Sequence, residues 1–312
     1  MSKYEYESFV ECKNCGCKYR SILDVCPNCG TGKKKQSYIP LILIVILMFA
    51  ITFVIVYFIT NRKVKEEPQE IASLPTYENV NSMYYSQLNE KEADIYNQLY
   101  NMCLNYETSF VPVNSDLYTV RRAIEAFRCE WPEYFWVSSS FNYTHKGDEV
   151  VNVEFNVETN DIKKEYEEIN SYVEEFISEI VDFPDEEQVK YIHDKMCDEF
   201  FYDKNYEECQ DISSMVYKQK GVCAGYALFF ELAMKKLGIE CYYVNGDGIN
   251  KDGVIPHAWD IVKVDDIYYW IDVTWDDFDY QGIATDYYYL QEANEDFKDH
   301  TIKNDFSFEI PN

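Results

Sequence analysis

The stretch Gly221-Val-Cys-Ala-Gly-Tyr-Ala227 leads into an apolar run over 228–237, which Gly238 follows. The run has apolar residues on nearly every face of a helix, so it predicts a buried helix that begins near Cys223 and ends at Gly238. At the first turn of a helix, exposed backbone N–H groups and the helix dipole favour a thiolate over a thiol. The stretch therefore predicts a nucleophilic cysteine at the start of a buried helix.

Two strand-like runs, 257–264 and 267–273, follow downstream on either side of a pair of aspartates. Runs of this kind around a two-residue turn predict a β-hairpin. In the register set by such a turn, Asp272 lies opposite Trp259 and diagonally across from His257 on one face of the hairpin. A carboxylate at that position can meet an imidazole N–H, so the hairpin predicts an oriented base. A nucleophile, a base and an orienting acid are what thiol acyl transfer requires.

These motifs resemble the bacterial branch of the transglutaminase-like superfamily, which is related to papain-type thiol proteases. The resemblance covers roughly residues 185 to 300 and rests mainly on the cysteine stretch, His257-Ala-Trp and Asp272-Val-Thr-Trp. It implies an α+β fold with a papain/transglutaminase-like core, in which the nucleophile helix packs on an antiparallel sheet. It also implies that Cys223 is the nucleophile, that His257 is the general base and acid, and that Asp272 orients His257.

Three aromatic residues flank the predicted triad, and we expect Tyr226, Trp259 and Trp275 to line the substrate cleft. We expect hydrolysis of amide bonds in peptides or proteins, because water needs no dedicated acceptor pocket, and no cofactor for catalysis. Two alternatives stay open, namely amine-accepting transglutaminase cross-linking and a non-catalytic module that binds envelope proteins. Asp260 stands where many relatives have Asn, and the residues before Cys223 do not identify a side-chain donor for the oxyanion hole.

The three remaining histidines receive structural interpretations from the sequence. His193 falls in the apolar stripe of a helix that Pro184-Asp185-Glu186-Glu187 is predicted to open, so we expect it to be a packing residue. His145 and His300 stand alone in polar surroundings, and we expect both to be exposed.

Two CxxC knuckles lie near the amino terminus with ten residues between them, Cys12-Lys-Asn-Cys15 and Cys26-Pro-Asn-Cys29. Four thiolates at this spacing bind a tetrahedral zinc ion, and the glycine after each knuckle permits a tight turn. The segment resembles a zinc ribbon over residues 1–37, with Cys12, Cys15, Cys26 and Cys29 as ligands. The zinc should be structural, because the protein fills all four positions. Cys17 is a spare thiol that could replace Cys15.

No residue between Lys35 and Arg62 is charged, which predicts a transmembrane helix over 38–60 and a linker over 61–81. Zinc-bound thiolates persist in a reducing compartment, so we expect a cytoplasmic amino terminus. The remainder would then lie outside the cell membrane as the extracytoplasmic part of a single-pass membrane protein.

The chain has 312 residues, and 47% hydrophobic and 17% aromatic content can supply a sizeable core, which excludes wholesale disorder. Its formal net charge of −28 repels nucleic acid. We therefore expect no nucleic-acid partner, while the predicted acyl-transfer chemistry implies a peptide or protein substrate. Beyond the linker, helix and hairpin patterns predict an α+β region over 82–182, and the transglutaminase-like domain follows over 183–312.

Overall fold

The computed structural model describes residues 8–32, 83–203, 210–251, 253–277, 285–293, 297–303 and 306. The chain divides into two compact units, Met1–Gln69 and Glu70–Asn312. The described residues of the first unit hold the cysteine knuckles. Those of the second hold the predicted triad.

The first unit contains a short antiparallel ladder, in which β1 (Phe9–Glu11) pairs with β2 (Lys18–Arg20). Each CxxC knuckle closes with a glycine in the left-handed region, Gly16 at φ 73° and Gly30 at φ 70°. The N–H of each of these glycines donates a 2.8 Å hydrogen bond to the carbonyl of the first cysteine in its knuckle. The predicted role of the two glycines in tight turns is therefore confirmed.

Among the described residues, the structure contains no helix with both the length and the apolar composition of a membrane span. The longest of them, α4 (Ile162–Ile177), has 16 residues, which makes about 24 Å against the roughly 30 Å of a bilayer core. This finding contradicts the predicted location in the cell membrane, and that prediction is withdrawn. The predicted transmembrane helix over 38–60 and the linker over 61–81 lie outside the described residues.

The second unit begins with two helices beside a three-stranded antiparallel sheet of order β3-β5-β4. A capping box at Asn89 and Glu92 starts the first of these helices, and the Asp116 side chain caps the second. Gly147, at φ 65°, makes the turn of the predicted hairpin. The elements are η1 (Tyr85–Gln87), α2 (Glu90–Leu104), β3 (Ser109–Phe110), α3 (Leu117–Arg128), β4 (Phe141–Lys146) and β5 (Glu149–Phe155).

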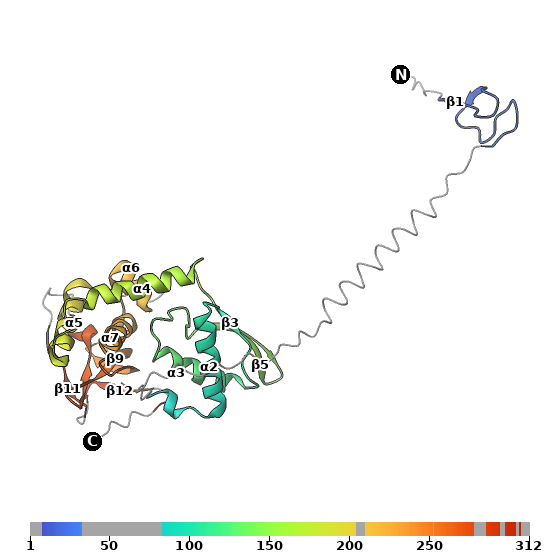
Figure 1. Cartoon of the computed structure of the whole chain (residues 1–312). Helices are drawn as coiled ribbons and strands as arrows, with labels where there is room; N and C mark the ends of the chain where they lie inside the picture. The colour runs from blue at the N-terminus through green and yellow to red at the C-terminus, as the bar shows by residue number, and fades with distance from the viewer. Residues whose placement is uncertain are drawn as a thin grey trace. The chain divides into compact units, whose positions relative to one another are not determined.

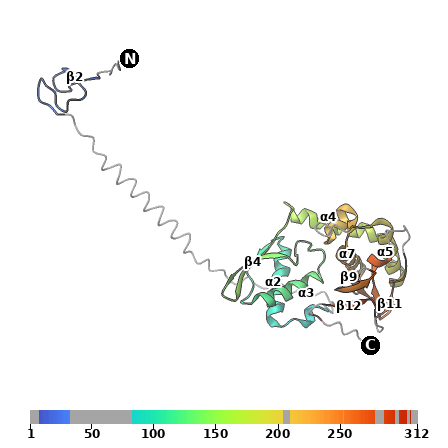
Figure 2. The same ribbon diagram turned by 180° about the vertical axis from the view of Figure 1, so that it is seen from behind.

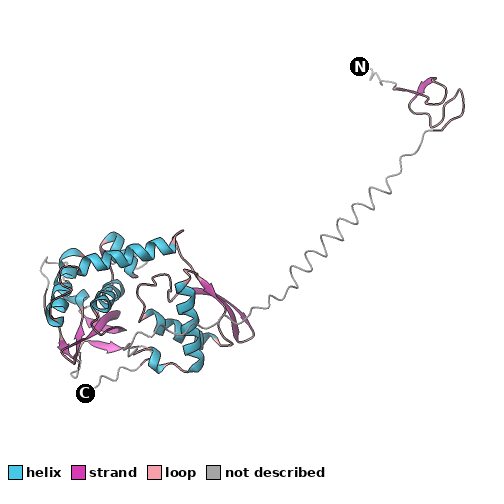
Figure 3. Cartoon of the chain, viewed as in Figure 1, coloured by secondary structure: helices cyan, strands magenta, loops and turns pink. Residues whose placement is uncertain are grey.

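The rest of this unit is built on a five-stranded antiparallel sheet of order β11-β10-β9-β8-β12. Figure 3 shows helices beside antiparallel strands in this unit, as in an α+β fold. After α4 come α5 (Asp185–Glu199), β6 (Phe201–Tyr202), α6 (Ile212–Lys218), β7 (Lys220–Gly221), α7 (Cys223–Leu237), β8 (Cys241–Asn250), β9 (Gly253–Val264), β10 (Ile267–Ile271), α8 (Val273–Asp276), β11 (Gln291–Glu292) and β12 (His300–Ile302).

Helix α7 is largely buried and packs on β8 and β9, as predicted for a helix on an antiparallel sheet. One side of it, with Ala227 and Leu228, joins the hydrophobic core around α2 and α3. Its other sides, with Phe229 and Phe230 among them, join the core around α4 and α5. Figures 1 and 2 show from opposite sides how α2 and α3 lie at one end of the unit and α5, α7 and β9 at the other.

The hairpin of β9 and β10 has the predicted register. Ile267 pairs with Val264 and Ile271 pairs with Asp260, so the next position, Asp272, falls opposite Trp259. The two turn residues, Asp265 and Asp266, have φ of 49° and 66°. Positive φ at both positions is typical of the type I′ turn, whose twist matches that of the strands.

Candidate active site

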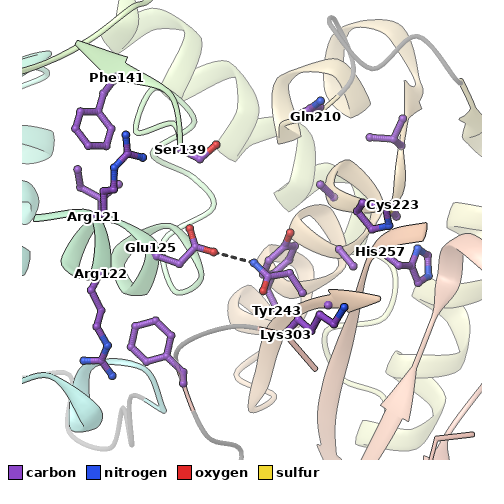
Figure 4. Close-up of a pocket in the computed structure, with 18 of the residues that line it drawn as sticks. Arg121, Arg122, Glu125, Ser139, Phe141, Gln210, Cys223, Tyr243, His257 and Lys303 are labelled. Carbon is purple, nitrogen blue, oxygen red and sulfur yellow. Dashed lines mark hydrogen bonds between the residues drawn. The ribbon is translucent and has the colours of Figure 1, made fainter. Parts of the chain in front are cut away.

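A cleft of about 660 Å³ opens beside the start of α7, and Cys223 and His257 both line it. Its walls come from distant parts of the sequence. One wall consists of residues from α7, β8 and β9, and the other of residues from α3 and β4. Figure 4 shows Cys223 and His257 on one side of this cleft and Arg121 and Phe141 on the other.

Cys223 is the first residue of α7 and is half-buried. The N-cap, Val222, has an extended backbone and offers no side-chain hydrogen bond to the N–H groups of the first turn. These N–H groups therefore remain available for a negative charge beside the thiol. The position combines access from the cleft with stabilisation of an anion.

His257 and Asp272 form a buried hydrogen-bonded pair, with 2.6 Å between His257 Nε2 and Asp272 Oδ2. Their side chains are 2% and 0% exposed. Asp272 also accepts a 3.2 Å hydrogen bond at Oδ1 from the backbone N–H of Trp275, which fixes the carboxylate from a second side. The bond to Asp272 occupies Nε2 of His257 and leaves Nδ1 free to serve the thiol.

The electrostatic surroundings of His257 and Asp272 favour the charged form of each side chain. Burial alone lowers the pKa of His257, but its interactions with the Asp272 carboxylate and with Cys223 together raise it to about 10. Burial raises the pKa of Asp272, yet its bonds and charge interactions with His257 and His300 bring it to about 2. At neutral pH the pair is an imidazolium and a carboxylate, and an imidazolium next to Cys223 stabilises a thiolate.

His300 belongs to the site, which the sequence did not predict. Its side chain is fully buried rather than exposed, and its Nε2 lies 3.1 Å from Asp272 Oδ2. Its Nδ1 lies 3.0 Å from Asp299 Oδ1, and its ring stacks on Phe297 with 3.9 Å between centroids. The prediction of an exposed His300 is wrong because β12 pairs with β8 and carries this side chain under the hairpin.

The two tryptophans shield the histidine and aspartate rather than line the cleft. Trp275 stacks on His257 with 4.5 Å between ring centroids, and Trp259 is 2% exposed. Neither is among the residues that line the cleft. Gly248 makes room for this packing, because a methyl group there would lie 2.7 Å from Trp275 Cζ2.

Tyr226, which the sequence placed in the cleft, is fully buried in the core around α4 and α5. Its hydroxyl donates a hydrogen bond to Asp277 Oδ2. A helix that is apolar on every face does not reveal which face borders the cleft, and this one turns Tyr226 inward. His193 is buried, as predicted for a packing residue, and its Nε2 lies 3.2 Å from Asp276 Oδ2.

Asp260, the residue that departs from the family pattern, is buried in β9. Burial and the neighbouring carboxyls of Glu231 and Asp272 raise its pKa well above the usual value. Its Oδ1 has no hydrogen-bond partner in the part of the chain that the structure describes. A protonated Asp260 has the shape and the neutrality of an asparagine.

In the first unit, the thiols of the four knuckle cysteines lie within 4.8 Å of one another. The Sγ atoms of Cys12 and Cys29 are 3.6 Å apart, and those of Cys15 and Cys26 are 3.7 Å apart. A tetrahedral zinc ion with Zn–S bonds of about 2.3 Å places its sulfur ligands about 3.8 Å apart. The four cysteines could therefore bind a metal ion of this size, while Cys17 stands outside the cluster.

Comparison with protein families finds a match to the transglutaminase-like superfamily over residues 175–276. The matched range runs from α4 to α8 and includes Cys223, His257 and Asp272. The second unit thus contains a transglutaminase-like domain. No curated protein matches the chain.

Several solved structures are similar to parts of the chain. One is the crystal structure of a TGase, with 17% identity, a TM-score of 0.33 and coverage of 44% of each chain. Another is the periplasmic domain of TgpA from Pseudomonas aeruginosa bound to ethylmercury, with 14% identity, a TM-score of 0.30 and coverage of 41% of this chain and 57% of that one.

A third is a candidate cysteine protease from Cytophaga hutchinsonii, with 14% identity and a TM-score of 0.31. The match covers 40% of this chain and 51% of that one. The chain thus spans about half the length of the solved structures to which it is similar.

Proposed function

We propose that this protein is a thiol acyl-transfer enzyme that hydrolyses amide bonds in peptides or proteins. The observation that carries the proposal is the buried 2.6 Å hydrogen bond between His257 and Asp272 beside a half-buried Cys223 in one cleft. Nucleophile, base and orienting acid in this order are what acyl transfer through a thioester requires. The transglutaminase-like domain over 175–276 supports the same class of chemistry.

In the first half of the proposed reaction, the Cys223 thiolate attacks the carbonyl carbon of the amide. The new C–S bond moves an electron pair to the carbonyl oxygen, and N–H groups of the first turn of α7 stabilise that oxyanion. The tetrahedral intermediate then expels the amine as the C–N bond breaks. The His257 imidazolium supplies the proton that the leaving amine takes, and a Cys223 thioester remains.

In the second half, neutral His257 takes a proton from water as the oxygen attacks the thioester. The C–S bond breaks, the acid product leaves, and the thiolate and imidazolium are restored. Asp272 stays a carboxylate throughout and holds the imidazole through the hydrogen bond at Nε2. Hydrolysis is favoured over amine transfer because water needs no dedicated acceptor pocket.

The full chain should be incubated with labelled casein, with and without a small primary amine such as dansylcadaverine. We expect new peptide termini with wild type and none with Cys223→Ala. Amine incorporation without new termini would reassign the protein to cross-linking chemistry. If neither product forms and the Cys223 thiol reacts independently of His257, the cleft is a non-catalytic binding site.

A further inference from the structure

The wall of the cleft that faces Cys223 carries its own binding groups. Arg121 and Tyr118 come from α3, and Phe141 comes from β4. The Asn245 amide of β8 donates a 2.7 Å hydrogen bond to Glu125 Oε1 of α3, and this bond spans the two walls (Figure 4). The facing wall is therefore held in a fixed position relative to the nucleophile.

Most charges that line the cleft are neutralised by a neighbour. Arg122 pairs with Glu92 at 2.7 Å, and Lys303 pairs with Asp247. Glu125 pairs with Arg128 of the same helix at 3.2 Å.

Arg121 differs from these lining residues. It is exposed and forms no ion pair or hydrogen bond with any residue that the structure describes. Its guanidinium lies 5.1 Å from the centroid of the Phe141 ring. This contact restricts the guanidinium plane and leaves its five N–H donors free on the cleft side.

We propose that Arg121 binds a carboxylate of the substrate, so that the cleft selects acidic peptides. This inference rests on the proposed function and names its substrate class. A planar guanidinium held over an aromatic ring binds a carboxylate through two parallel hydrogen bonds with little loss of side-chain entropy. The net charge of −28 repels acidic segments elsewhere, so an unpaired cation in the cleft gives local selectivity.

The carboxylate can come from an Asp or Glu side chain or from a free peptide C-terminus. The full chain with Cys223→Ala should be titrated with fluorescent alanine-rich hexapeptides, in which each position in turn carries Glu, Gln or Lys. Each peptide should be made both as a free acid and as an amide, which separates the two sources. Binding to this variant needs no turnover, so its outcome is independent of whether the protein hydrolyses amides.

We expect at least one Glu or free-acid peptide to bind about 10-fold more tightly than its Gln or amide partner, as one charge-assisted hydrogen-bonded pair provides. Arg121→Gln should abolish that preference, and Arg121→Glu should shift it toward the Lys peptide. Lys91→Gln makes the same charge change on α2 outside the cleft and should leave the preference intact.

The proposal is overturned if no peptide binds, if Glu and Gln peptides bind equally at every position, or if the preference survives Arg121→Gln. Equal loss of the preference in Arg121→Gln and Lys91→Gln would assign it to the overall charge of the unit and overturn the proposal. Failure of casein hydrolysis with an intact Arg121-dependent preference would overturn the proposed function and leave an acidic-peptide binding site.

Discussion

His300 and His257 both reach the same oxygen of Asp272, at 3.1 Å and 2.6 Å from their Nε2 atoms. One carboxylate oxygen thus connects the histidine that faces the cleft with a second, fully buried histidine. Asp299 and the Phe297 ring hold that second histidine in place. Besides His257, the Asp272 carboxylate meets two further groups, His300 Nε2 at the same oxygen and the Trp275 N–H at the other.

We predict that His300 acts as a positioning residue for Asp272. His300→Phe should lower turnover by about 10-fold, the value of one hydrogen bond to a charged group. His300→Gln keeps a donor and should recover most of the loss. The measurement is kcat with a cleaved substrate, checked by circular dichroism for an intact fold. An equal loss of turnover in the Phe and Gln variants would contradict the positioning role and show that His300 only packs in the core.

Asp260→Asn should stabilise the protein at neutral and alkaline pH. The pKa of Asp260 is raised in the folded state, because burial disfavours the carboxylate. Its contribution to the free energy of unfolding is therefore fully present below the pKa that Asp260 has in the unfolded chain. This contribution is lost as the pH rises toward the raised pKa of the folded state. The asparagine variant cannot ionise, so its advantage should grow by about 1.4 kcal/mol per pH unit from the unfolded pKa, roughly 4, until the pH reaches the raised pKa of the folded state. Urea unfolding of both proteins between pH 4 and pH 8 measures this difference. A difference that does not change with pH would show that Asp260 is ionised in the fold.

Gly248→Ala should disturb the shield over His257. The added methyl group meets Trp275 at 2.7 Å and the His257 Cβ at 3.2 Å, which should cost about 1–3 kcal/mol of unfolding free energy and lower turnover. Ile249→Ala changes the next residue of β8, whose side chain is 48% exposed, and should change neither quantity. Unfolding curves and kcat provide the two readouts. A Gly248→Ala protein with normal stability and turnover would contradict the close packing.

The cysteine cluster should hold one zinc ion per chain. Chelation should unfold the segment 1–37, because metal ligation contributes most of the folding free energy in so small a segment. Cys15→Ser should lose the metal, whereas Cys17→Ser should keep it. Elemental analysis of reduced full-length protein measures the stoichiometry. Zinc content near zero, or equal loss in both variants, would contradict this assignment.

The sequence predicts those parts of the site that depend on local patterns. The start of α7 at Cys223 follows from the apolar run and its Gly238 end, and the His257–Asp272 pair follows from a two-residue turn that fixes the register. Both patterns lie within short segments. Local periodicity and turn chemistry are the strongest signals that a single sequence contains.

The rest of the site depends on contacts between distant segments. His300 reaches Asp272 because β12 pairs with β8, and the hydrogen bond joins residues 28 positions apart with no periodic pattern between them. Arg121 faces Cys223 because α3 lines the opposite wall of the cleft, where Glu125 of α3 accepts a hydrogen bond from Asn245 of β8. Neither pairing has a sequence signature, which is why both residues were found only in the structure.

The dependence of Cys223 alkylation on His257 tests the central claim most directly. Iodoacetamide rates at pH 7, followed by peptide mapping of the full chain, should show Cys223 reacting faster than the buried Cys103 and Cys129. His257→Ala should slow this reaction by about 10-fold or more, because the imidazolium no longer stabilises the thiolate. Asp272→Asn should slow it less and keep the fold. A Cys223 that reacts equally fast with and without His257 would contradict the account.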